Sequence, residues 1–202
     1  MGKVITVTRE FGSMGRKIAK LAAEKMNFKY YDRDIIELTA KELRGSVEEL
    51  SNFEDKKISV FQKMMYPLGR GTSSMQNTLY EMEKSVILDL ASAGDCVIVG
   101  RCSDFILHES GHKDMLNVFI YAPYDTRIIN SENELGLSQG MAEDCVEKVD
   151  KARQDFYRLH TGESFYSHKY RNLMIDSSVM SHEKCAEVIA EIAQEKFKLK
   201  IN

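Results

Sequence analysis

The stretch from Lys3 to Arg16 decides the fold, and it reads K-V-I-T-V-T-R-E-F-G-S-M-G-R. It joins a short apolar run, a turn containing glycines and the beginning of an amphipathic pattern. The apolar side chains after the turn recur at helical spacings of three and four, namely Ile18, Leu21, Ala22 and Met26. We therefore predict a buried strand, a tight turn and a helix. The backbone N–H groups of such a turn, together with the helix dipole, cradle phosphate groups.

The turn departs from the usual phosphate-loop pattern, G-x-x-x-x-G-K-[ST]. Gly15 and Arg16 align with the G-K pair. Glu10 then stands at the first glycine, and Lys17 stands where a Ser or Thr meets Mg²⁺. Arg16 preserves phosphate recognition because a guanidinium binds two phosphate oxygens at once, whereas the hydroxyl is lost unless Ser13 or another group replaces it. The alternative is a strand, turn and helix whose glycines only permit the turn.

The composition is that of an ordinary globular protein. Of the 202 residues, 43% are hydrophobic and 29% are charged, which favours one domain with a real core. The net charge of −3 provides no basic field for nucleic acid, so we expect no nucleic-acid partner. No apolar run approaches the roughly 20 residues of a membrane-spanning helix. Because the N-terminus also lacks a secretory signal, we expect a cytoplasmic protein without a membrane partner.

The cysteines and histidines suggest no metal site. The four cysteines lie far apart without a C-x-x-C pair, which predicts reduced and buried thiols. His108 and His112 have a helical spacing, but Gly111 interrupts that segment and no third ligand is evident. We therefore expect no protein ligands for a metal ion.

Strand and helix signals alternate along the chain. Short apolar runs predict strands at Val4–Thr8, Phe28–Tyr31, Cys96–Val99, Asn117–Tyr121 and Leu173–Ile175. Helical stripes lie between these runs, and Gly94, Ser138 and Ser181 stand at positions typical of helix caps. This alternation predicts an α/β fold, a three-layer sandwich with a five-stranded parallel sheet and a central first strand.

Residues 33–78 interrupt the alternation after the second predicted strand. The segment begins with a helical pattern and then becomes polar and rich in methionine. We interpret it as a helical insertion within a single domain spanning residues 1–202. Such an insertion is an acceptor-binding arm, a surface helical hairpin or a contact in a homodimer.

Three further stretches extend the pattern begun by the loop. The second strand ends in Tyr30–Arg33 (Y-Y-D-R), and the third leads through Val97–Asp104 (V-I-V-G-R-C-S-D). A long helix before the last strand contains Val149–Arg158 (V-D-K-A-R-Q-D-F-Y-R). With the G-S-M-G-R loop and the strand end at Met174–Ser178, this order resembles the cytidylate-kinase-like family, a divergent branch of the P-loop nucleoside monophosphate kinases. The resemblance covers nearly the whole chain and implies a fold of the P-loop NTPase type.

The resemblance implies an acceptor pocket at the ends of the second and third strands. The family carries an Asp beside the monophosphate site, and Asp32 matches it. The family pattern D-G-R-D retains Gly100 and Arg101 here but loses both acidic residues, so we expect no strong preference for cytosine. The acceptor-binding residues implied are Asp32, Arg33, Gly100, Arg101 and Asp104. The alternative for Arg101 is an ion pair that ties the third strand to a neighbouring carboxylate.

The resemblance also implies a donor site and a lid. ATP would bind at Gly12, Ser13, Met14, Gly15, Arg16 and Lys17, with Mg²⁺ held through the donor phosphates. The arginine-rich lid of the family corresponds to the stretch that contains Lys151, Arg153 and Arg158. The catalytic residues implied are Arg16, Arg127, Lys151, Arg153 and Arg158. For each residue of the long helix, a solvated face with intrahelical ion pairs is the alternative.

These observations lead to one main hypothesis and two alternatives. The main hypothesis is an ATP-dependent kinase of a small phosphorylated or hydroxylated acceptor, most of all a nucleoside monophosphate. The first alternative is a noncatalytic nucleotide-binding or regulatory module on the same fold, which the altered loop motivates. The second is a structural interaction protein that binds no nucleotide.

Overall fold

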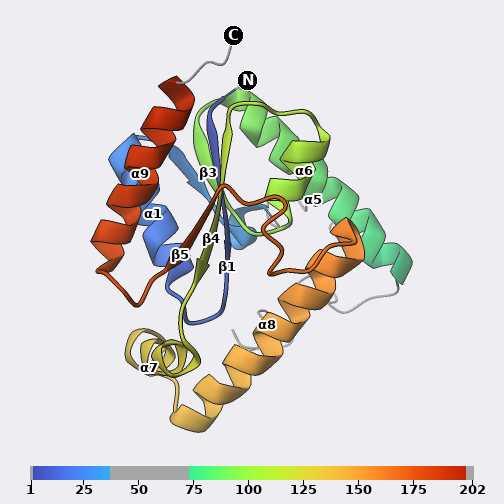
Figure 1. Cartoon of the computed structure of the whole chain (residues 1–202). Helices are drawn as coiled ribbons and strands as arrows, with labels where there is room; N and C mark the ends of the chain where they lie inside the picture. The colour runs from blue at the N-terminus through green and yellow to red at the C-terminus, as the bar shows by residue number, and fades with distance from the viewer. Residues whose placement is uncertain (1, 37–72, 199–202) are drawn as a thin grey trace.

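The computed structural model describes residues 2–36 and 73–198, which form a parallel sheet between layers of helices (Figure 1). The strands are β1 (Val4–Arg9), β2 (Lys29–Tyr31), β3 (Cys96–Val99), β4 (Met115–Tyr121) and β5 (Leu173–Asp176). Their order is β2-β3-β1-β4-β5, and every neighbouring pair is parallel. The predicted five-stranded sheet with a central first strand is therefore confirmed. In the register of β1, Val7 lies between Val99 and Val118.

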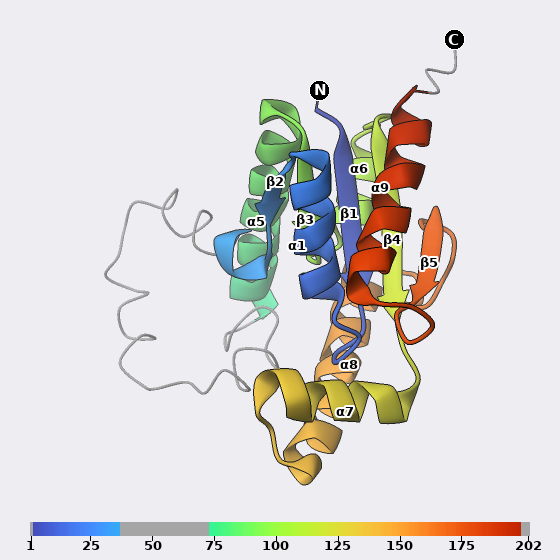
Figure 2. The ribbon, with the colours of Figure 1, turned by 90° about the vertical axis from the view of Figure 1, so that its left-hand side faces the viewer.

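The helices cover both faces of the sheet and its carboxyl edge. They are α1 (Gly15–Met26), α5 (Ser73–Ala93), α6 (Ser103–Glu109), α7 (Tyr124–Leu135), α8 (Gln139–Thr161) and α9 (His182–Lys198). α1 and α9 pack on one face, and α5 and α6 on the other (Figures 1 and 2). Figure 2 shows α7 and α8 beyond the carboxyl ends of the strands, where parallel sheets bind their ligands.

The sequence of α1 explains how this helix is held directly behind the turn. Besides Gly15 at its first position, its buried residues are Ile18, Ala19, Ala22 and Ala23, and these four pack in the core between the sheet and α9. Three of these four side chains are small, so the helix approaches its neighbours closely. The helix ends at Asn27, which adopts the left-handed conformation that is usual after a last turn.

The expected elements agree with the observed ones except at their ends and in one short helix. β4 begins at Met115 instead of Asn117, and α6 was not predicted, because its seven residues are too few to show a period. Ser181 caps α9 by accepting a hydrogen bond from the N–H of Lys184 at 3.2 Å. Ser138 occupies the N-cap of α8 without such a bond. All four cysteines are free and buried, as predicted.

The predicted insertion at 33–78 lies mostly outside the described residues, because the description omits 37–72. Its role as an acceptor arm or a dimer contact stays a prediction. In the portion that the structure does describe, no helix combines the length and apolar character needed to cross a membrane.

Candidate functional site

The turn between β1 and α1 has a backbone suited to anions. Gly12 and Met14 are both left-handed, with φ values of +74° and +58°. Within the described residues, the N–H groups of Ser13, Met14, Gly15 and Arg16 have no hydrogen-bond acceptor. The first N–H groups of a helix have no partner inside it, and the helix dipole gives them partial positive charge. The turn therefore presents a row of free donors of the kind that binds phosphate oxygens.

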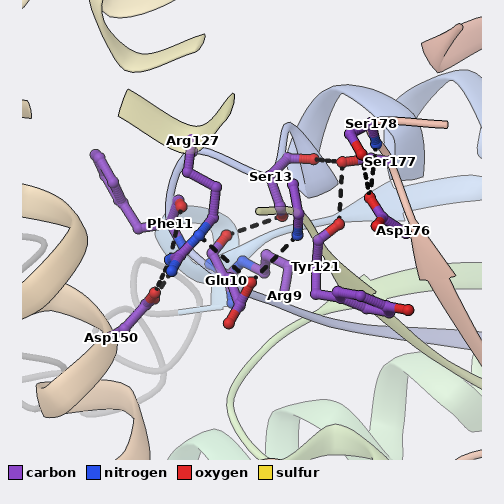
Figure 3. Close-up of polar contacts among 12 residues, drawn as sticks. Arg9, Glu10, Phe11, Ser13, Tyr121, Arg127, Asp150, Asp176, Ser177 and Ser178 are labelled. Atoms are coloured by element: carbon purple, nitrogen blue, oxygen red, sulfur yellow. Dashed lines mark hydrogen bonds and ion pairs between the residues drawn. The ribbon is translucent and has the colours of Figure 1, made fainter. Parts of the chain in front are cut away.

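The carbonyl groups of the turn are held by side chains from other elements (Figure 3). Nδ2 of Asn130 on α7 donates to the Gly12 carbonyl at 2.9 Å, and Oγ of Ser177 after β5 donates to the Ser13 carbonyl at 2.8 Å. A Cβ on Gly12 would lie 2.4 Å from the Arg127 carbonyl oxygen, so only glycine fits between the turn and α7. These contacts occupy the carbonyl side of the turn and leave its N–H side open.

Asp150 connects α8 to the turn. Its Oδ1 accepts a hydrogen bond from the N–H of Phe11 at 2.7 Å and lies 3.3 Å from Nη1 of Arg153, while its Oδ2 pairs with Arg127 (Figure 3). Nε of Arg127 also lies 3.5 Å from Oε2 of Glu10. In this arrangement Arg127 anchors the turn to α8, and its expected catalytic role stays a prediction.

Arg16 points toward the end of β2, although it stands at the lysine position of the usual loop. Its Nη2 pairs with Asp32 and lies 3.0 Å from Oδ2 of Asp34. Lys17 lies on the other side of the helix, where its Nζ is 2.8 Å from Oε1 of Glu134 on α7. The structure therefore brings together Arg16, which was expected to bind the donor, and Asp32, which was expected to bind the acceptor. The positive charge of Arg16 is paired with the carboxylates of Asp32 and Asp34.

Arg101 follows β3 in a left-handed conformation and is buried. Its Nη2 lies 3.2 Å from Oε1 of Glu83 on α5, and its guanidinium lies over the ring of Phe156. Arg101 therefore contacts an acidic side chain of α5, as its alternative role anticipated, and the charge of that acid depends on pH. Asp104 is fully buried and pairs with Arg171. The expected contacts of Arg101 and Asp104 with an acceptor stay predictions.

Glu83 makes the stability of the protein sensitive to pH. Burial raises the pKa of Glu83 to about 8, and the positive charge of Arg33 opposes this effect only in part. The folded state then holds a proton that the unfolded state releases near pH 4.5, so the free energy of unfolding falls as the pH rises from about 4.5 to 8. We expect Glu83→Gln, which resembles the protonated acid, to flatten this decline in urea denaturation between pH 5 and 8.5.

The neighbouring Glu81 provides the control, because it lies on the same helix but is 65% exposed in its side chain and pairs with Lys84. Glu81→Gln should leave the pH dependence unchanged. An equally steep decline in the Glu83→Gln and wild-type proteins would show that Glu83 does not titrate in this range.

α8 brings only one of its three predicted lid residues to the turn. Nη1 of Arg153 donates to the Arg9 carbonyl at 3.1 Å, and its guanidinium lies 5.9 Å from the centre of the Phe11 ring. Lys151 is exposed and lies 3.6 Å from Asp155, and Arg158 is also exposed. The helix therefore presents Arg153 to the site and the other two to solvent, although their roles in a closed form stay predictions.

Arg9 belongs to the site, and the sequence analysis did not single it out. It is the last residue of β1, and its Nε is buried without a hydrogen-bond partner among residues 2–36 and 73–198. Burial lowers its pKa most, and the neighbouring charges of Arg153, Arg16 and Arg33 lower it further. The available signal was a charged residue at the end of an apolar strand, immediately before the turn.

Two glycines make room for Arg9. A Cβ on Gly100 would lie 2.4 Å from Nη1 of Arg9, and a Cβ on Gly15 would lie 2.5 Å from Cβ of Arg9.

We expect Gly15→Ala to lower the free energy of unfolding by about 1–3 kcal/mol through overpacking. The added methyl group would meet Cβ and Cγ of Arg9, which cannot move aside as the end of a flexible side chain can. Urea denaturation measures this change. Gly140→Ala is the control, because nothing lies within 4 Å of a Cβ there, and equal stability of both variants would contradict the crowding.

The described residues were expected to contain no protein ligand for Mg²⁺, and this stays a prediction. They contain no group of three or more His, Cys, Asp or Glu residues that could hold a metal ion. The hydroxyl of Ser13, the one candidate in the turn, donates to the Glu10 carbonyl at 3.0 Å. This hydrogen bond uses the hydrogen of the hydroxyl and leaves lone pairs on Oγ of Ser13, and the expected binding of Mg²⁺ through the donor phosphates stays a prediction.

The comparison with protein families agrees with this geometry. A model described as the cytidylate kinase-like family matches residues 4–179. The chain belongs to the cytidylate kinase-like family. None of the curated proteins matches the chain.

Solved structures extend the comparison to the fold. An uncharacterized protein from Eubacterium ventriosum superposes with a TM-score of 0.73, at 20% identity over 95% of this chain and 98% of its own. Shikimate kinase from Acinetobacter baumannii, in complex with shikimate, has a TM-score of 0.54 at 14% identity over 99% and 97%. A gluconokinase from Sinorhizobium meliloti has a TM-score of 0.55 at 12% identity over 98% and 97%.

These similarities show that this member of the cytidylate kinase-like family has the fold of the P-loop kinases. Family membership supports phosphoryl transfer as the general activity. At identities of 20% or less, the neighbours show the fold and leave the acceptor open.

Proposed function

We propose that the protein transfers the terminal phosphoryl group of ATP to a small acceptor, most of all a nucleoside monophosphate. The observation that carries this proposal is the row of free N–H donors from Ser13 to Arg16, at an edge of the sheet where arginines from several elements converge. These arginines are Arg9, Arg16, Arg33, Arg101 and Arg153. Arginine side chains beside free backbone donors suit a polyphosphate better than a neutral ligand.

Phosphoryl transfer requires few chemical groups from a protein beyond those in this arrangement. The protein has to position two substrates and place positive charge around the phosphoryl group in transit. In the proposed reaction the turn binds the donor phosphates, and Arg153 contributes charge from α8. Mg²⁺ accompanies the donor phosphates as their counterion and needs no protein ligand.

The acceptor is proposed to lie between the ends of β2 and β3. Asp32 stands at the first of these ends, and Gly100 and Arg101 stand at the second. Since Val99 and Cys102 replace the acidic residues of the family pattern, we propose a base other than cytosine. We further propose that the insertion at 33–78, of which residues 37–72 lie outside the described residues, is an acceptor-binding arm.

One observation favours the noncatalytic alternative. Arg16 and Arg101 are two of the arginines expected to act on substrates. Arg16 is paired with carboxylates, and Arg101 lies against the buried carboxyl group of Glu83. A module that binds nucleotide without turnover would tolerate such pairing. A kinase requires that at least the remaining arginines reach the phosphates.

A coupled assay of ADP release separates the two proposals. The full chain is incubated with ATP and Mg²⁺ and each common nucleoside monophosphate. Shikimate and gluconate are added to the panel because structural neighbours are kinases named for them. Acceptor-dependent ADP release supports the kinase. Binding of ATP by calorimetry without release for any acceptor favours the noncatalytic module, and the absence of ATP binding rejects both.

The remaining expectations complete the proposal. The net charge of −3 supports a small-molecule substrate over nucleic acid, and we propose a cytoplasmic location without a membrane partner. A homodimer through the segment 33–78 is the alternative to its role as an acceptor arm, and sedimentation of the full chain tests it.

A further inference from the structure

Arg9 is a cation without a counterion. Within the described residues its guanidinium makes no hydrogen bond and no ion pair, and its Nε is buried. Burial lowers the pKa of Arg9 most, and the neighbouring positive charges of Arg153, Arg16 and Arg33 lower it further. Arg9 as a whole is half-buried, so the buried and unpartnered atom is its Nε. A buried polar group without a partner is costly, and a ligand of opposite charge at the guanidinium would offset that cost.

The position of Arg9 is also built into the fold. Its stem lies against Gly15, the last glycine of the turn, and its Nη1 lies against Gly100 at the end of β3. Any larger residue at Gly100 would displace the guanidinium, because a Cβ there would come within 2.4 Å of Nη1. The side chain of Arg9 is therefore enclosed by two separate sequence motifs, G-S-M-G-R and V-G-R.

Arg16 is the obvious rival, because it stands at the position of the loop lysine. Its charge, however, is already shared between Asp32 and Asp34. Arg9 extends from the turn toward β3, the side on which the acceptor is proposed to bind. The phosphate that faces the acceptor is the terminal phosphate of the donor.

We propose that Arg9, and not Arg16, binds the terminal phosphate of the nucleoside triphosphate and replaces the lysine of the usual loop. This inference rests on the proposed function, because it names the side chain that binds the terminal phosphate of the phosphoryl donor. It makes the preference for a triphosphate over a diphosphate depend on Arg9. It also makes the unliganded protein less stable than it would be without this charge.

Calorimetric titration tests the first consequence with four probes: ATP, ADP, inorganic tripolyphosphate and pyrophosphate. Arg9→Gln should weaken the binding of ATP and tripolyphosphate by about 10- to 100-fold, as expected for a lost charged hydrogen bond. The affinities for ADP and pyrophosphate should change by less than about threefold. Arg16→Gln should reduce the preference for ATP over ADP less than Arg9→Gln does.

Lys113→Gln is the matched control. It removes the same charge from an exposed residue that precedes β4, at the opposite edge of the sheet. Its affinities for all four probes should equal those of the wild type. A folded Arg9→Gln protein that keeps the ATP affinity of the wild type would overturn the proposal, and so would an equal loss for ATP and ADP.

Stability without ligand provides the second readout. Arg9→Met keeps the length of the side chain and removes the unpaired charge, so its melting temperature without ligand should rise above that of the wild type. A lower melting temperature would mean that Arg9 stabilises the fold itself, and this would overturn the proposal.

The binding data distinguish failure of this proposal from failure of the proposed function. A wild-type protein that binds none of the four probes would reject the proposed function as well. Normal binding by the wild type together with an unaffected Arg9→Gln variant would reject the role of Arg9 alone.

Discussion

Replacing Asp150 by asparagine is expected to lower the free energy of unfolding by about 3 kcal/mol. The substitution keeps the shape of the side chain but removes its charge, so Arg127 remains buried opposite a neutral group. Breaking a buried ion pair from one side typically costs 3–5 kcal/mol. We expect the lower end of this range, because Oε2 of Glu10 remains 3.5 Å from Nε of Arg127. Urea denaturation at pH 7 measures the change.

The same helix provides a control for Asp150→Asn. Asp144 also loses one negative charge when it is changed to asparagine, but its partner Lys148 and Asp144 itself are about half exposed in their side chains. An exposed pair of this kind contributes at most about 0.5 kcal/mol. Similar losses for the two variants would mean that Asp150 is no more important than a surface carboxylate, and the anchoring of the turn would need another explanation.

A double substitution measures the energetic coupling between Arg127 and Asp150. Arg127→Met combined with Asp150→Leu removes both charges, so neither charge remains buried without its partner. We expect the double variant to lose less stability than the sum of the losses in the single variants Arg127→Met and Asp150→Leu. Strictly additive losses would show that Arg127 and Asp150 are not coupled.

The backbone of the site was predictable from the sequence, because it depends on local patterns. Alternating apolar runs and helical stripes specify the parallel sheet, and the glycines specify a turn at the end of β1. The carboxyl ends of parallel strands share one edge, so the sequence also indicated that the loop, Asp32 and Arg101 would lie near one another.

The partners of the charged side chains were not predictable in the same way. Whether Arg16 contacts a phosphate or Asp32 depends on side-chain directions that no period in the sequence records. The contact between Arg101 and Glu83 joins the end of β3 to α5, and the helical pattern around Glu83 does not indicate this partner. Arg9 was overlooked because the phosphate-loop pattern begins one residue later, at Glu10.

The largest effect on activity is expected at Arg153. Its Nη1 contacts the Arg9 carbonyl and Asp150, so α8 holds this arginine beside the turn before any substrate binds. Under the proposed function, Arg153→Ala removes a positive charge next to the transferring phosphoryl group. Loss of such a group in phosphoryl transfer costs about 10³-fold or more in kcat. The coupled ADP-release assay, run with the acceptor that gives turnover, measures this decrease.

A purely structural role for Arg153 makes a different prediction. Its contacts to a backbone carbonyl and to Asp150 are worth about 1–2 kcal/mol of stability, so a structural residue would lower the melting temperature and leave kcat of the folded fraction unchanged. Arg153→Lys should recover part of the lost kcat because it restores the charge without the second hydrogen bond. Lys148→Gln, which removes a charge from the exposed side of the same helix, should not alter kcat. A folded Arg153→Ala protein with the kcat of the wild type would exclude Arg153 from catalysis and leave α8 with only its anchoring role.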